Sequence, residues 1–213
     1  MVVAFDSTGL QRLDETTWAH PASGDRIHIS LNGSPLSEPA WLENIPAMRY
    51  NLAVEYAQMG CLIEAEPVVL GGVRGVCQVV KAPIPNAPSG QVFLANIFLA
   101  KADRHVMFGC SAGESGITGV REAAIMAELG LMLDGWVLPH PYAPELRGRL
   151  PYHRGDDPAW DARFPEHPLS RVRAWVRWVL ATATVDPAFA ALPDFVPGPP
   201  APGPGSAGWP DQR

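Results

Sequence analysis

CLIEAEPVVLGGVRGVCQVVK, residues 61–81, is the stretch that decides the fold. It consists of two apolar runs rich in β-branched residues, separated by Gly71 and Gly72. Glycine adopts the positive φ angles of a tight hairpin turn without steric cost, so this pattern predicts a β-hairpin. Because a hairpin joins antiparallel neighbours, we expect the sheet that grows from it to be antiparallel.

The turn also fixes a register for the two strands. This register pairs Leu70 with Val73, Glu66 with Cys77, and Glu64 with Val79. Glu64 and Glu66 then share one face of the sheet, where they act as paired carboxylates, line a solvated face, or meet Arg74 and Lys81. Lys81 lies diagonal to Glu64, close enough for a weak ion pair.

Four more strands are expected around the hairpin. Alternating or continuous apolar runs place them at Val2–Phe5, Arg26–Leu31, Gln91–Lys101 and Asp103–Cys110. Gln91–Lys101 is apolar on both faces except for Asn96, which is typical of a central strand covered from both sides. The sequence therefore predicts an antiparallel sheet of about six strands.

Helices are expected on either side of this sheet. Asn44 is placed to cap a helix over Ile45–Met59, and Gly60 is placed as its left-handed stop. A second helix is expected near Thr118–Leu131, and Pro168 opens a third. The expected buried stripes are Met48, Leu52, Tyr56 and Met59 in the first helix and Val120, Ala124, Ala127 and Leu131 in the second.

The rest of the chain divides into three parts. Residues 1–195 are expected to form one α+β domain, with a core at 1–133 and a wrapped loop and C-terminal helix at 134–195. Residues 196–213 are rich in Pro and Gly, a composition that cannot build a core, so they are expected to be a disordered tail. Trp136, Tyr142, Tyr152 and Trp160 are expected to fix the wrapped loop.

Composition narrows the choice of partners. A net charge of −6 and thinly spread basic residues give no field for a phosphate backbone, so nucleic acid is not expected. The N-terminus lacks a basic leader, and no apolar run approaches the length of a membrane span, so a cytoplasmic protein is expected.

Cys61, Cys77 and Cys110 are an odd set without metal-ligand spacing, and they are expected to be buried reduced thiols.

The order of two strands, helix, two hairpins and helix, with Trp18 after the first strand, resembles the PsbP-like fold over Val2–Leu133. That group includes the photosystem PsbP proteins, DcrB-like lipoproteins and Eag-type secretion chaperones. The resemblance implies an α/β/α sandwich and a non-catalytic binding role. It assigns no role to any single residue.

One motif suggests catalysis. Gly109–Gly113 reads GCSAG, which matches the strand-to-helix turn where a hydrolase presents its serine. Ser111 would be the nucleophile of a small serine hydrolase, with His140 or His153 as the base. Against this, a hydrolase needs a parallel sheet, and the next helix begins too late for a tight elbow. A connecting Gly/Ser loop over Gly109–Gly116 is the preferred interpretation.

The wrapped loop gathers residues that could form a metal or acid–base site: His140, His153, Asp156, Asp157, Asp161 and His167. Their spacing fits no known ligand set, and Asp157 before Pro158 is typical of a helix cap. No sequence pattern points to a nucleotide loop either. We therefore expect no metal and no cofactor.

Trp178 is expected to be partly exposed beside Arg171 and Arg177, since its helix already fills its apolar face. Aromatic residues next to arginine are typical of protein-binding hot spots. The preferred function is thus a non-enzymatic protein-binding module, an adaptor, chaperone or immunity-type protein, with Glu64 and Glu66 as further contact candidates. The alternatives are the Ser111 hydrolase and a small-molecule cavity under Trp136 and Tyr152.

Overall fold

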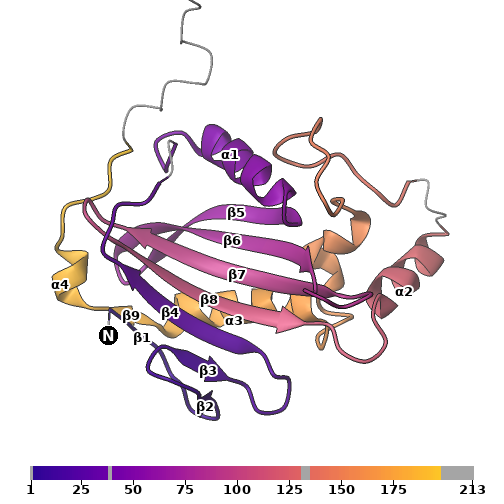
Figure 1. Cartoon of the computed structure of the whole chain (residues 1–213), viewed down its shortest axis with the longest axis horizontal. Coiled ribbons are helices and arrows are strands. Elements are labelled where there is room, and N and C mark those ends of the chain that lie inside the picture. Colours follow the sequence, from indigo (N-terminus) through magenta and orange to yellow (C-terminus); the bar gives the residue numbers. More distant parts are fainter. Residues whose placement is uncertain (1, 38–39, 131–134, 198–213) are drawn as a thin grey trace, which may run out of the picture.

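The computed structural model describes residues 2–37, 40–130 and 135–197. Within these residues the protein is an α+β structure with a large antiparallel sheet of seven strands, a second sheet of two strands and few helices (Figure 1). The expected sheet was one strand smaller. The tail expected from residue 196 lies, from residue 198 onward, outside the described residues.

The large sheet is antiparallel throughout, as the hairpin predicts. Its order is β2 (Gln11–Arg12), β3 (Thr17–Ala19), β4 (Arg26–Asn32), β8 (His105–Gly113), β7 (Gln91–Ala100), β6 (Val73–Pro83) and β5 (Cys61–Leu70). The first expected strand is absent from this sheet. It is β1 (Val3–Ala4), which pairs instead with β9 (Thr184–Val185) after the last long helix.

The central hairpin has the predicted register, with Gly71 and Gly72 at φ angles of 55° and 80°. The expected Glu64–Lys81 ion pair is wrong. Lys81 is fully buried, and a buried ammonium group needs an anion that is also shielded from water. Its Nζ lies 2.6 Å from the buried carboxylate of Asp156. Glu64 is only half-buried and pairs with Arg173.

Helix α1 (Ile45–Ala57) begins as predicted, because the Asn44 side chain accepts a hydrogen bond from Ala47 N–H. It ends before Gly60, which is not left-handed. A Cβ at Gly60 would lie 1.9 Å from the Lys81 carbonyl oxygen, so glycine is required there by the close approach of β6. The expected stripe is wrong at Met59, which is 52% exposed beyond the helix end.

The other helices are α2 (Val120–Leu129), α3 (Pro168–Thr182) and α4 (Pro187–Ala190), with two short 3-10 helices, η1 (Arg154–Asp156) and η2 (Pro158–Trp160). The stripe expected for α2 is wrong, since that helix buries Arg121 and Ile125 and exposes Val120. Arg121 turns inward because its guanidinium bonds to Ser170 and Asp161. Leu131 lies outside the described residues.

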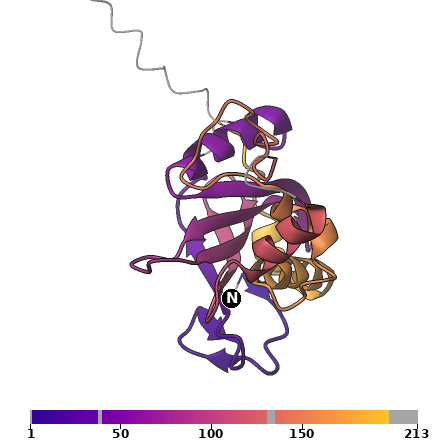
Figure 2. The ribbon, with the colours of Figure 1, turned by 90° about the vertical axis from the view of Figure 1, so that its right-hand side faces the viewer.

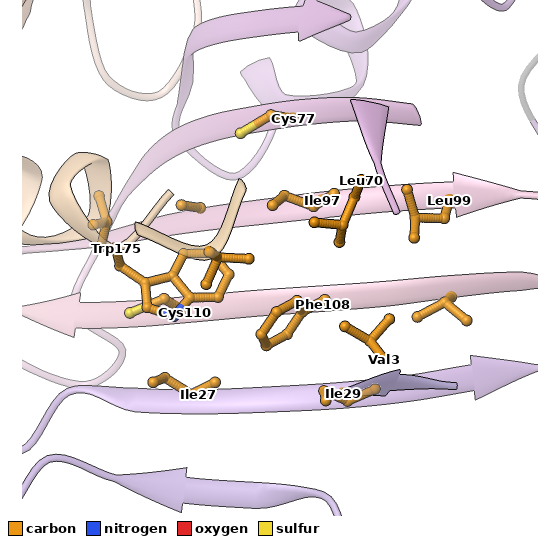
Figure 3. Close-up of a cluster of buried hydrophobic side chains, with 14 of the residues drawn as sticks. Val3, Ile27, Ile29, Leu70, Cys77, Ile97, Leu99, Phe108, Cys110 and Trp175 are labelled. Atoms are coloured by element: carbon orange, nitrogen blue, oxygen red, sulfur yellow. The ribbon is translucent and has the colours of Figure 1, made fainter. Parts of the chain in front are cut away.

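The two sheet faces carry different layers. Helix α3 packs on one face against a core that includes Phe93, Ile97, Leu99 and Phe108 (Figures 2 and 3). Helix α1 packs near the β5 edge of the other face, over Leu62. Strand β7 lies between β6 and β8, as expected of a central strand.

No helix in the described part of the chain has the length and apolar character needed to cross a membrane.

Candidate functional site

A groove of about 690 Å³ lies between helix α3 and the N-terminal end of strand β4; we call it the Trp178 groove. It is lined by Asp6, Thr8, Leu10, His20, Ala22, Ser23, Asp25, Ile27, Cys110, Ser115, Glu166, Arg171, Trp175 and Trp178. Two of the predicted contact residues, Trp178 and Arg171, therefore meet in one cavity. The volume is in the range typical of binding sites.

Helix periodicity explains how α3 contributes three residues to the groove. Arg171, Trp175 and Trp178 are separated by four and three positions, so they lie on one stripe of the helix. Trp175 is buried at the floor, and Trp178 is 36% exposed. The predicted partial exposure of Trp178 is confirmed.

Packed aromatic rings support the floor of the groove. The Phe5 ring lies 6.2 Å from Trp178 and 5.0 Å from Trp18, centroid to centroid, both in edge-on geometry. On the inner side, Trp175 packs edge-on at 5.0 Å against Phe108, and Figure 3 shows its indole beside Cys110. The groove is thus built on an ordered aromatic cluster.

A bidentate ion pair joins the two walls of the groove. Arg171 Nε and Nη2 each donate to Asp25 at 2.8 Å, so a residue of α3 is tied to the start of β4. The Asp25 carboxylate raises the pKa of Arg171. Arg171 also donates to the Glu166 carbonyl.

The rim of the groove is acidic. Asp6 and Glu166 are exposed there, while the charge of Asp25 is matched by Arg171. The pKa of Asp6 is lowered by hydrogen bonds from the hydroxyl and amide of Thr8. Sequence reasoning missed Asp6 and Asp25, because they come from the N-terminal segment and no sequence pattern links that segment to α3.

The other predicted contact residues do not line the groove. Arg177 and Glu64 line a separate hollow of about 220 Å³ with Arg173. Glu66, on β5, pairs with Arg49 of α1. The two glutamates are thus held by arginines from different helices rather than by Arg74 or Lys81.

Ser111 lies within strand β8, so the expected loop over Gly109–Gly116 is wrong up to Gly113. The strand continues because Cys110 and Ala112 alternate into the core. Ser111 pairs across the sheet with Arg26 and Leu94, and α2 begins only at Val120. This is not the sharp turn on which a hydrolase presents its serine.

The two histidines proposed as its base lie elsewhere. His140 Nε2 is 2.9 Å from the Leu62 carbonyl on β5, which is separated from β8 by two strands. At about 4.8 Å between neighbouring strands, this is a separation of roughly 14 Å. His153 is buried and stacks on Trp136 at 4.7 Å. Among the described residues, no hydrogen bond joins Ser111 to a histidine.

Two acidic residues of the wrapped loop pair with buried cations. Asp156 binds Lys81 and the amide of His153, and Asp161 binds Arg121 and Arg173. These contacts hold the loop against β6 and α3. Asp157 caps the turn at η2, as predicted, by accepting from Ala159 N–H.

Three of the described side chains approach the geometry of a cation site: Glu114, Glu122 and His167. His167 Nε2 is 4.0 Å from Glu114 and 3.9 Å from Glu122. However, His167 Nδ1 accepts a hydrogen bond from Leu169 N–H, so the ring proton of the neutral imidazole is on Nε2. That nitrogen has no lone pair for a cation in this arrangement.

A cavity of about 290 Å³ does lie beneath the wrapped loop. Tyr152 and His140 line it, but Val137 takes the place expected for Trp136, which turns toward His153. Both nitrogens of His140 are already engaged, by the Leu62 carbonyl and by Tyr142 N–H. The cavity wall is mostly apolar.

The cysteines are free and buried, as predicted. Burial raises the pKa of Cys61, Cys77 and Cys110 to about 12, so none is a ready nucleophile at neutral pH.

Comparison with known protein families and with curated proteins gives no match for the chain.

Proposed function

We propose that this protein is a non-enzymatic protein-binding module and that the Trp178 groove holds a segment of its partner. The observation that carries the proposal is the meeting of Trp178 and Arg171 in one groove whose floor includes Trp175 and is backed by packed aromatic rings. Tryptophan and arginine dominate the energetics of protein interfaces, chiefly where a rigid pocket surrounds them. A binding role also agrees with the resemblance to the PsbP-like group, which remains part of the proposal.

The ion pair between Arg171 and Asp25 supports the same function. It fixes the spacing between α3 and the start of β4 before a partner arrives, so little ordering is required on binding. The groove has a volume of about 690 Å³, and its lining comes from four separate parts of the chain. That volume accommodates several residues of a peptide segment.

The test replaces Trp178 with a photoreactive benzoylphenylalanine in the full chain, in the cell from which the protein comes. The matched control carries the same residue at Val69, which is 61% exposed on β5, the edge strand at the opposite end of the sheet from β2. We expect one protein to be crosslinked from position 178 and not from position 69, and we expect this crosslink not to form when Arg171→Ala is combined with the substitution at 178. Equal labelling from both positions would contradict the proposal.

A fluorophosphonate probe addresses the hydrolase alternative. If the probe labelled Ser111 and Ser111→Ala removed the labelling, the protein would be an enzyme and the binding proposal would fail. We expect no labelling, because Ser111 has no histidine partner among the described residues and lies in mid-strand.

A further inference from the structure

We infer that the segment held in the Trp178 groove carries a large apolar side chain next to a lysine or arginine. This inference rests on the proposed function and names the chemistry of the partner. It follows from two independent features of the groove, its apolar floor and the charge of its rim.

The floor selects the apolar side chain. Ile27, Cys110 and Trp175 are buried beneath the groove, and Leu10 is half-buried at its side. A volume of about 690 Å³ accommodates a leucine or an aromatic ring together with its neighbours in the peptide. Filling it removes apolar surface from water on both partners, which stabilises the complex.

The rim selects the basic side chain. Three carboxylates, Asp6, Asp25 and Glu166, and one arginine, Arg171, line the groove. Asp25 is already paired with Arg171. Asp6 and Glu166 are exposed carboxylates outside this pair, so the rim carries more negative than positive charge. Opposite charge across an interface favours binding and raises the association rate. The partly exposed indole of Trp178 adds a surface over which a cation is attracted.

A partner protein is the occupant we propose, but the chain has a competing segment of its own. Residues 198–213 include Trp209 and Arg213, an aromatic and a basic residue four positions apart. The Trp209→Ala variant distinguishes the two, because it removes the apolar group of that segment without shortening the chain.

The experiment pans a displayed library of random dodecapeptides on the immobilised full chain. We expect the enriched peptides to carry Lys or Arg within two positions of Leu, Phe or Trp. Affinity is then measured by fluorescence anisotropy with the strongest peptide. Trp178→Ala should weaken it about tenfold or more, and the double variant Asp6→Asn, Glu166→Gln about threefold to tenfold, with less dependence on salt.

Glu55→Gln, on the exposed side of α1, is the matched charge control and should leave the affinity unchanged. Enrichment of acidic or uncharged peptides that still need Trp178 would overturn the inference and leave the proposed function standing. Absence of any peptide that depends on Trp178 would count against both. Peptides that bind only the Trp209→Ala variant would show that the chain's own terminal segment fills the groove, and would overturn the inference.

Discussion

At the scale of single residues, Gly109 shows what the GCSAG motif does in this protein. It pairs with His28 on β4 and with Asn96 on β7, and the side chains of both neighbours approach its Cα. A Cβ at this position would lie 2.3 Å from Asn96 Oδ1 and 2.6 Å from His28 Cε1. Glycine is therefore required by packing across three strands and not by a catalytic turn.

We expect Gly109→Ala to lower the free energy of unfolding by about 1–3 kcal/mol, because the packed side chains of Asn96 and His28 must move to relieve the clash. Urea denaturation monitored by tryptophan fluorescence measures this change. Gly113→Ala on the same strand is the control, since nothing lies within 4 Å of its added Cβ. An equal loss in the two variants would mean that backbone freedom, and not packing, explains Gly109.

At the scale of elements, strand β5 illustrates how an exposed sheet edge is protected. Some of its outward backbone groups are bonded by side chains: the Ala65 N–H donates to Tyr142 Oη at 3.1 Å, and Arg49 Nε donates to the Ala65 carbonyl at 2.8 Å. The Leu62 carbonyl likewise accepts a hydrogen bond from His140 Nε2 at 2.9 Å. An edge closed like this is a poor template for pairing with another chain.

Tyr142→Phe tests this protection, because it removes the hydroxyl and leaves the ring. We expect the Ala65 amide to exchange with deuterium at least about tenfold faster, since its hydrogen-bond acceptor is lost. The Ile97 amide, in the centre of the sheet, is the internal reference and should keep its rate. Unchanged exchange at Ala65 would show that another group protects it.

The same strands show how far the sequence could predict the structure. The hairpin at Gly71 and the caps at Asn44 and Asp157 were predictable, because each depends on neighbouring residues alone. The Trp178 groove was predictable only in part: exposure of Trp178 follows from helix periodicity, but its meeting with Asp25 depends on contacts 146 positions apart. No local sequence pattern predicts such a contact. The ion pair between Lys81 and Asp156, which are 75 positions apart, was unpredictable for the same reason.

At the scale of the whole molecule, the interface between the sheet and its α3 layer contains many buried charges. Lys81, Arg121 and Arg173 are buried there and bonded to Asp156, Asp161 and Glu64. Breaking one partner of such a pair leaves an uncompensated charge in a dry environment. His153 is buried and His167 is partly buried in the same layer, and both make its stability depend on pH.

Burial lowers the pKa of His153 to about 4 and that of His167 to about 3, from 6.5 in the unfolded chain. Between pH 6.5 and about 4 the unfolded state therefore binds more protons than the folded state. Stability is fully present above pH 6.5 and is lost as the pH falls through this window. From pH 7 to pH 5, each ring contributes a loss of about 2 kcal/mol.

We expect His167→Asn to reduce the loss of stability between pH 7 and pH 5 by about 2 kcal/mol, measured by urea denaturation at both values. Asparagine removes the titrating ring and keeps an oxygen that can accept the Leu169 N–H at the start of α3. His20→Asn, which replaces an exposed histidine in the same way, is the control and should keep the wild-type dependence. If His167→Asn lost as much stability as the wild type over this range, the ring would be protonated in the folded protein and the Leu169 N–H would need another acceptor.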